Sequence, residues 1–251
     1  MKILVTFAVE AEFAPWRSLR LFKRIDTGMD ADAYQVEING SQVCVLLTGI
    51  GGDKSWVEAT KLIWNLDVDM CISSGLAGGL RAEHVLGEVV VARQVEATSR
   101  RRTIECDQEM VALALRCGAK DVQLMYSTDH VVISVIEKNE LGKVADVVDM
   151  ESGDILYEAV AFGARVVAVR AVSDSSQEDL PIDFNRVVTK EGDVSITRVL
   201  GEVARRPSVL PSLVRFGKQT RAAAEKLAEV LDRYIELLAA MNSVSAEKAA
   251  S

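Results

Sequence analysis

Three acidic residues follow apolar segments that are typical of buried strands. Glu12, Glu151 and Asp174 each come within a few positions of the end of such a segment. Because ligands of open α/β sheets bind beyond the carboxyl ends of the strands, we expect the three side chains to share one site. Three carboxylates at one site suit cleavage of a glycosidic bond, in which one protonates the leaving group, one activates water and one holds sugar hydroxyls. Taken singly, each acid is also compatible with a helix terminus or a loop.

The elements that position these acids alternate between strands and helices. Continuous β-branched runs predict buried strands, and the Asn-Gly pair at 39–40 predicts a tight turn between two strands. The predicted helices are 10–21, 53–66, 151–162 and 217–241. This order predicts a single α/β domain over residues 1–241 with a largely parallel or mixed sheet. The predicted strands are 3–9, 34–38, 42–47, 70–73, 87–94 and 165–172, with weaker ones at 122–126 and 131–135.

The C-terminal part of the sequence differs in composition from the rest. Residues 198–241 are predicted to form a basic and amphipathic helical extension, in which apolar residues recur every three or four positions from 227 to 241. The stretch suits contact with an anionic membrane surface or, alternatively, a solvated face that also forms a dimer contact. Residues 242–251 are small and polar, which predicts a disordered tail. Within 198–221, Glu202 is the one acid among the basic residues Arg198, Arg205, Arg206, Arg215, Lys218 and Arg221.

Composition narrows the possible classes of protein. The chain has 251 residues, 49% of them apolar and 26% charged, which is typical of a globular protein rather than a disordered one. A net charge of -8 argues against general nucleic-acid binding. No apolar run is long enough to span a membrane, and acidic residues come too early for a secretory signal, so we expect a cytoplasmic protein with reduced cysteines. With two histidines and no phosphate-loop or dinucleotide fingerprint, we expect no metal and no cofactor.

Six short motifs resemble those of the nucleoside phosphorylase superfamily, in particular its branch of methylthioadenosine/S-adenosylhomocysteine nucleosidases. The resemblance implies a three-layer fold in which helices flank a central twisted mixed sheet. It also implies a homodimer or higher homo-oligomer that cleaves the N-glycosidic bond of a purine nucleoside derivative and releases the base. In the order in which that family has them, the motifs lie at 8–12, 48–51, 74–80, 87–91, 148–151 and 169–174.

The resemblance assigns roles to residues of these motifs. Glu12 corresponds to the base that activates water, and Asp174 to the acid that protonates the purine. Glu151 and Met150 correspond to the pair beneath the ribose. The chemistry of these residue types is consistent with the assigned roles, because a carboxylate stabilises the cationic sugar and burial favours the protonated form of a leaving-group acid. The resemblance further implies a substrate-binding set of Ala8, Gly75, Leu76, His130, Val131, Val132, Asp149 and Ser173.

Several positions depart from the pattern of that branch. Leu76 replaces its usual serine, and Ser73 stands where phosphorolytic relatives often have an arginine, so hydrolysis is favoured over phosphorolysis. Val131 replaces the usual aromatic residue, which predicts weaker stacking on the base.

Three further interpretations stay open. Segments between 193 and 213 resemble the end of hopanoid-associated phosphorylases, which implies an adenosine attached to a hopane lipid. Futalosine hydrolysis is a second alternative within the superfamily. A nucleoside-binding module without catalysis is an alternative from another class, although a protein that only binds needs no acid at the leaving group.

Overall fold

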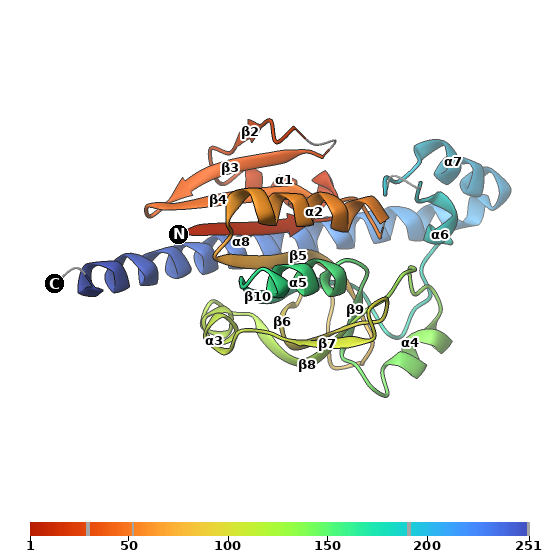
Figure 1. Ribbon diagram of the computed structural model, residues 1–251. Coiled ribbons are helices and arrows are strands. Elements are labelled where there is room, and N and C mark those ends of the chain that lie inside the picture. Colours follow the sequence, from red (N-terminus) through yellow and green to blue (C-terminus); the bar gives the residue numbers. More distant parts are fainter. Residues whose placement is uncertain (29–30, 52, 190–191, 250–251) are drawn as a thin grey trace.

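The strands form one mixed sheet. The computed structural model describes residues 1–28, 31–51, 53–189 and 192–249, and Figure 1 shows the arrangement of its elements. Among these residues the strand order is β10-β6-β8-β9-β5-β1-β4-β3-β2, with β7 paired to β6. The strands are β1 (Lys2–Phe7), β2 (Lys23–Ile25), β3 (Ala33–Ile38), β4 (Ser41–Leu47), β5 (Met70–Gly79), β6 (Val89–Ala97), β7 (Arg102–Glu105), β8 (Lys120–Ser127), β9 (Val147–Asp149) and β10 (Arg165–Asp174).

One half of the sheet closes on itself. Strand β10 pairs in parallel with β5 and antiparallel with β6, while β6, β8, β9 and β5 are joined in turn. These five strands form a small ring, from which β1, β4, β3 and β2 extend as an open sheet. Because β1, β5 and β10 run in parallel, their carboxyl ends lie at the same edge.

Helices cover both faces of the sheet. Helices α2 and α5 pack together on one face, and α1 packs against α8 on the other (Figure 1). Shorter helices α4, α6 and α7 lie at one end of the molecule. This arrangement confirms the predicted α/β class with a central mixed sheet flanked by helices. The helices are α1 (Glu10–Arg17), α2 (Asp53–Leu66), α3 (Gln108–Arg116), α4 (Val135–Leu141), α5 (Ser152–Ala161), α6 (Phe184–Val187), α7 (Ile196–Arg205) and α8 (Leu210–Ala249), with a 3-10 turn at Pro207–Val209.

The central strands are apolar because both of their faces are covered. Residues 3–7 of β1 and 166–173 of β10 are buried without interruption, as expected for strands between two helical layers. Helix α8 packs against α1 and strands β10, β5 and β6 and adds one apolar stripe to the core. The buried members of that stripe include Leu227, Leu231, Tyr234 and Leu238, at the spacing that predicted an amphipathic helix.

Polar contacts fix the position of α8 relative to α1. The Asp232 carboxylate accepts hydrogen bonds from the Trp16 indole at 3.0 Å and from the Arg20 guanidinium at 2.7 Å. A bidentate arginine–carboxylate pair has a fixed geometry, so it sets the register of the two elements as well as their separation. Helix α1 carries Glu12, so this contact also positions one wall of the site described below.

Some boundaries differ from those predicted. The strand predicted at 131–135 is wrong: residues 131–134 lie in a loop, and α4 begins at Val135. The backbone of Val131 bonds the Asn185 side chain instead of a neighbouring strand. Helix α1 ends at Arg17 rather than residue 21, and α8 begins at Leu210 rather than 217. Residues 242–249 continue α8 where a disordered tail was predicted, and 250–251 lie outside the described residues. No helix in the described ranges is long and apolar enough to cross a bilayer.

Candidate active site

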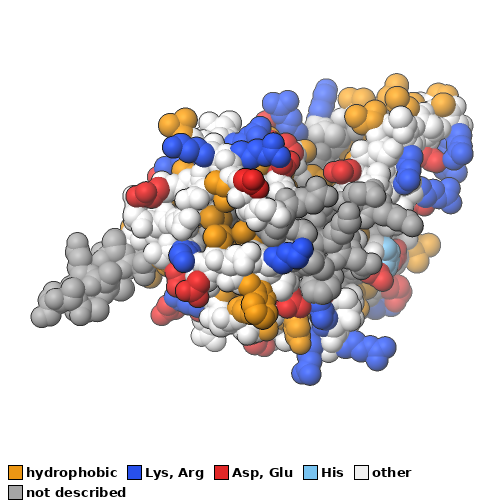
Figure 2. All heavy atoms as spheres, turned by 45° about the horizontal axis from the view of Figure 1, so that its top comes forward, with side chains coloured by type: hydrophobic (Ala, Val, Ile, Leu, Met, Phe, Trp, Pro, Cys, Tyr) orange, Lys and Arg blue, Asp and Glu red, His pale blue; other side chains and the backbone are white. Residues whose placement is uncertain are grey.

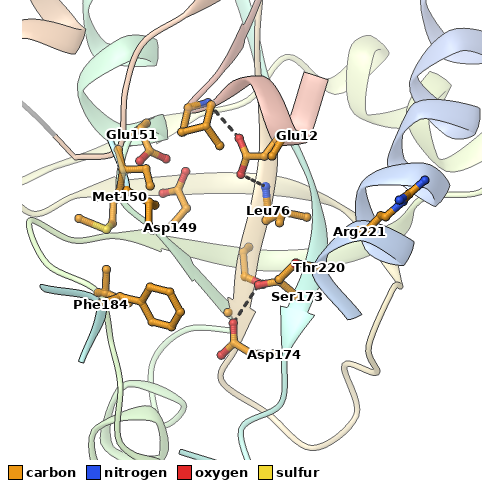
Figure 3. Close-up of a pocket in the computed structure, with 18 of the residues that line it drawn as sticks. Glu12, Leu76, Asp149, Met150, Glu151, Ser173, Asp174, Phe184, Thr220 and Arg221 are labelled. Carbon is orange, nitrogen blue, oxygen red and sulfur yellow. Dashed lines mark hydrogen bonds between the residues drawn. The ribbon is translucent and has the colours of Figure 1, made fainter. Parts of the chain in front are cut away.

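A mostly apolar cavity of about 920 Å³ lies where the carboxyl ends of β1, β5 and β10 meet. Figure 3 shows labelled side chains from α1, β5, β10 and the loop after β9 around this space. The sequence predictions for the site therefore converge on one place. The cavity is lined by every predicted site residue except Gly75, namely Ala8, Glu12, Leu76, His130, Val131, Val132, Asp149, Met150, Glu151, Ser173 and Asp174.

Glu12 lies in the first turn of α1 and is held by two backbone donors. Its Oε2 accepts a hydrogen bond from the Ala8 N–H at 3.0 Å, and its Oε1 accepts one from the Leu76 N–H, also at 3.0 Å (Figure 3). Burial raises the pKa of Glu12 above its usual value, and the nearby Arg170 and the backbone donors offset this only in part. A rigid carboxylate with a raised pKa is suited to accept a proton from water.

Arg170 is the buried cation that compensates the acids of the site. It points from β10 beneath the cavity, and its guanidinium lies 2.6 Å from Asp149 and 3.6 Å from Glu151. The same group donates to Ser73 Oγ at 2.9 Å and Ser152 Oγ at 3.0 Å. Its Nη atoms make these contacts, so Arg170 supports the floor of the cavity from below and does not line it.

Glu151 occupies the position between β9 and α5. Its Oε1 accepts a hydrogen bond from the Gly51 N–H at 3.1 Å, so the loop after β4 reaches the site through its backbone. Burial raises the pKa of Glu151 to about 8; Arg170 opposes this shift, and the carboxylates of Asp149 and Glu12 add to it. A carboxyl group of this kind can accept hydrogen bonds from a pair of sugar hydroxyls, and those donors would in turn favour its charged form.

Asp174 ends β10 and is bound from two sides. Ser173 Oγ donates to Oδ2 at 2.9 Å, and the buried ammonium of Lys138 donates to Oδ1. These two donors hold both oxygens of the Asp174 side chain in place at the end of β10.

Gly75 lies beneath the cavity rather than on its wall. Its φ of +135° is in the region that favours glycine, and a Cβ at this position would lie 2.7 Å from both Arg170 Nη1 and Glu12 Oε2. Gly75 therefore provides space at the site rather than a contact with a ligand. Because it has no side chain, the Arg170 guanidinium and the Glu12 carboxylate can both lie close to it.

The loop after β8 forms another wall of the cavity and is held in place by one amide. Asn185 Oδ1 accepts a hydrogen bond from the Val131 N–H at 2.7 Å, and its Nδ2 donates to the Val131 carbonyl at 3.0 Å. His130 is half exposed and bonded to Asp129 and Glu137, which raise its pKa. Phe184 of α6 lines the same cavity and places an aromatic ring in it (Figure 3).

The cavity continues beyond these residues as a groove between α1 and α8. Small and apolar side chains dominate both sides of it, and Arg221, paired with Glu225 at 3.0 Å, lies along it. Phe216 packs against Phe184, with ring centroids 5.3 Å apart. The walls of the groove are Ala11, Ala14, Pro15, Ser18 and Leu19 from the α1 side and Phe216, Gly217, Thr220, Arg221, Glu225, Ala228 and Glu229 from α8.

One cluster of potential metal ligands is found in the described part of the chain, and it lies outside this cavity. It consists of Glu83, His84 and Asp146. The Asp146 carboxylate is already bound by Arg81 at 2.8 Å and by the Leu124 N–H at 2.9 Å. A cation-neutralised carboxylate is a poor metal ligand, so this cluster is better described as an ion-pair network.

The family model of the phosphorylase superfamily matches residues 2–236. The chain belongs to the phosphorylase superfamily. The family resemblance predicted from the six motifs is thereby confirmed.

Individual relatives of this superfamily member are distant in sequence but alike over their whole length. The 5′-methylthioadenosine/S-adenosylhomocysteine nucleosidase of an Exiguobacterium species is 24% identical over 239 residues, covering 82% of this chain and 98% of that protein. A crystal structure of the Helicobacter pylori nucleosidase of the same name has a TM-score of 0.72 at 19% identity, covering 94% and 98% of the two chains. Futalosine hydrolase of Helicobacter pylori has a TM-score of 0.68 at 20% identity, covering 92% and 97%. At these identities the structural likeness shows the fold.

Three residues of this phosphorylase-superfamily site were missed by the sequence analysis. Arg170 did leave a signal, since it is the one charged residue within the apolar run 166–173. Lys138 left none, because it belongs to a polar helical segment far from Asp174 in sequence. Phe184 left none either, because it lies on a four-residue helix that has no periodic pattern.

Proposed function

We propose that this protein is a nucleosidase, which hydrolyses the N-glycosidic bond of a purine nucleoside derivative and releases the free base. The observation that carries the proposal is the placement of Glu12, Glu151 and Asp174 around one cavity. Its whole-length similarity to proteins named as 5′-methylthioadenosine/S-adenosylhomocysteine nucleosidases supports the same conclusion.

In the proposed reaction, Glu12 and Glu151 act on the sugar. Glu12 takes a proton from the attacking water, whose oxygen forms the new bond to the anomeric carbon. Glu151 accepts hydrogen bonds from the ribose hydroxyls and stabilises the positive charge that develops on the sugar ring. Met150 precedes Glu151 and supplies an apolar surface beneath the ribose, which keeps bulk water away from the cation.

Asp174 acts on the leaving base. As the N-glycosidic bond breaks, the electron pair passes to the purine, and a proton from Asp174 neutralises the ring nitrogen that receives it. Lys138 then stabilises the Asp174 carboxylate that remains. Ser173, which donates to the same carboxylate, orients it toward the base.

Water rather than phosphate is the proposed nucleophile. Among the described residues that line the cavity, the basic side chains His130 and Arg221 are each paired with acids. Ser73, at the position where an arginine is expected for phosphorolysis, is buried and bonded to Arg170 and Ser152. A phosphate monoanion or dianion would therefore meet three carboxylates without a free cation to offset the repulsion.

The test is base release from adenosine, inosine, methylthioadenosine, S-adenosylhomocysteine and futalosine, with and without phosphate. The expected result is release without phosphate and recovery of the free sugar. Release that requires phosphate would contradict hydrolysis. Tight binding without release would support a binding module. Asp174→Asn is expected to lower kcat by about 10² to 10⁴-fold while the affinity for substrate changes little.

The groove between α1 and α8 favours a second, narrower candidate in which the 5′ carbon of the nucleoside carries a bulky apolar group. A cavity of about 920 Å³ is at the upper end for a small-molecule site, and small or apolar residues of α1 and α8 line the part of it that lies between these helices. This is the feature that the hopanoid-associated interpretation requires, and a methylthio group alone would leave it unfilled.

A series of 5′-alkylthioadenosines of increasing length tests this candidate. Each buried methylene contributes about 0.8 kcal/mol, so kcat/KM is expected to rise about fourfold per carbon until the groove is full. Ala14→Trp fills the groove and is expected to abolish the gain while leaving methylthioadenosine cleavage nearly unchanged. A flat or falling series in the wild-type protein would rule out the apolar 5′ group without affecting the proposed hydrolysis.

The expected homodimer or higher homo-oligomer and the cytoplasmic location stay predictions. Sedimentation velocity of the purified chain tests the first, and cell fractionation tests the second.

A further inference from the structure

We infer that α7 and the start of α8 form an attachment surface for anionic membranes. The surface, called here the α7 surface, consists of the apolar residues Val194, Ile196, Leu200, Leu210 and Val214 and the basic residues Arg205, Arg206, Arg215 and Lys218. This inference goes beyond the proposed hydrolysis and does not depend on it.

The apolar side chains of α7 face solvent. Helix α7 has no buried residue, although its apolar and polar residues are segregated on opposite faces. Ile196 is 75% exposed and Leu200, one turn later, is 61% exposed. A helix that is amphipathic but packs neither face into the core leaves its apolar stripe available for a partner.

The surroundings of this stripe are basic. Residues 194–218 contain five basic residues and one acid, in a chain whose net charge is -8. Arg205 and Arg215 pair with Glu202 and Glu178, yet their side chains stay 74% and 59% exposed. Figure 2 shows hydrophobic side chains with lysine and arginine beside them at the end of the molecule formed by α7. The rest of the chain is correspondingly more acidic.

Contacts within the protein hold α7 in place, so its exposed apolar side chains have a fixed position. Arg198 donates to the Val188 carbonyl at 3.0 Å and to the Arg186 carbonyl at 3.4 Å, which ties α7 to α6. Ser195 caps its first turn, and Val188 and Val194 form a β-bridge at its base.

The charge of the α7 surface favours a membrane over a second copy of the chain as its partner. In a two-fold symmetric contact through this surface, the same patch would face itself and bring arginines against arginines. An anionic lipid surface instead complements the basic residues and accepts the apolar ones at the depth of the headgroups. Val194 and Phe216 also line the rim of the cavity, so a membrane held here would lie beside its opening.

The experiment is flotation of the full chain with vesicles of phosphatidylcholine, with and without phosphatidylglycerol. The expected result is binding only to the vesicles that contain phosphatidylglycerol, weakened strongly by about 0.5 M salt. Ile196→Ser with Leu200→Ser is expected to weaken binding about tenfold or more, and so is Arg205→Glu with Arg206→Glu. Cleavage of a soluble nucleoside and circular dichroism report on folding of each variant.

Matched controls come from elsewhere on the surface. Leu21→Ser removes an apolar side chain that is 92% exposed, and Arg101→Glu with Arg102→Glu reverses another adjacent pair of exposed arginines. Both controls are expected to bind vesicles like the wild type. Failure of the wild type to bind anionic vesicles, or equal binding to neutral ones, would overturn the inference. A dimer that Ile196→Ser with Leu200→Ser dissociates would overturn it as well, in favour of an interface between copies.

Discussion

Lys138 donates a hydrogen bond to the Asp174 carboxylate from a side chain that is completely buried. Its ammonium also donates to the carbonyls of Ser175 at 2.8 Å and Glu178 at 3.1 Å. These acceptors fix the ammonium on one side of Asp174 and leave the other oxygen to Ser173 and the cavity. Lys138 is thus a positioning residue in the proposed mechanism, because it orients the acid and stabilises the anion left after proton transfer.

Replacing Lys138 by Met is expected to lower kcat about 100-fold with a smaller change in KM, because the anion of Asp174 loses its partner. Breaking a buried pair also destabilises the fold by about 3–5 kcal/mol, so kinetics are measured where thermal unfolding shows the variant folded. Lys138→Arg is expected to restore part of kcat. The exposed Lys143→Met serves as the control, and an unchanged kcat in folded Lys138→Met would contradict the assigned role.

Glu12→Gln is expected to lower kcat by about 10² to 10⁴-fold while the substrate still binds, because the amide cannot take the proton of water. Burial raises the pKa of Glu12 above its usual 4.5, and the base acts only when ionised. In the wild type, kcat/KM should therefore fall as the pH decreases toward this raised pKa. A pH profile of the residual activity of Glu12→Gln is expected to lack this limb, and persistence of the limb would assign it to another group.

Glu151 makes the stability of the unliganded protein depend on pH. Burial raises the pKa of Glu151 from 4.5 to about 8, so the folded chain binds this proton more tightly than the unfolded chain. The resulting stability is fully present below pH 4.5 and is lost as the pH rises through about 8. Relative to Glu151→Gln, the free energy of unfolding of the wild type should fall by about 5 kcal/mol over this range. Urea denaturation at several pH values measures it, and parallel curves for the two proteins would refute it.

Gly75→Ala tests the space beneath the site. The added Cβ would lie 2.7 Å from Arg170 and Glu12, and the φ of +135° is strained for alanine. We expect a loss of about 1–3 kcal/mol of stability from backbone strain, together with a larger loss of activity because Glu12 is displaced. Gly118→Ala is the matched control, since its φ is +103° with nothing within 4 Å of the new Cβ. Equal effects of the two changes on activity would show that strain alone matters.

Local sequence patterns were sufficient to predict most of the core and the convergence of the acids. The runs that became β1 and β10 are continuous and β-branched, and that pattern has few other solutions in an α/β fold. The valine-rich segment 131–135 misled the same reasoning. The Asn185 side chain bonds both backbone groups of Val131, and this contact 54 residues away in sequence is one that no local pattern encodes.

Contacts between distant segments account for the rest of what sequence reasoning missed. Lys138 and Asp174 are 36 residues apart in sequence. Arg20 and Asp232, whose ion pair joins the α1 region to α8, are 212 residues apart. The Lys138–Asp174 pair joins α4, which lies between β8 and β9 in sequence, to the end of β10, and these three strands belong to the closed ring. The role of Arg170 could have been predicted from the sequence, because an isolated arginine in a buried strand must have acidic partners. The partners themselves could be named only from the structure.

The ring of strands also orders events during synthesis. Strand β10 supplies both closing pairings, and it emerges from the ribosome only after about two-thirds of the chain. Until then β5 and β6 have open edges of the kind that recruit other chains. The same strand carries both Arg170 and Asp174, so the buried cation and the leaving-group acid arrive in the step that seals those edges. An incomplete chain thus holds uncompensated acids at the future site, and it gains charge balance and protection from aggregation together.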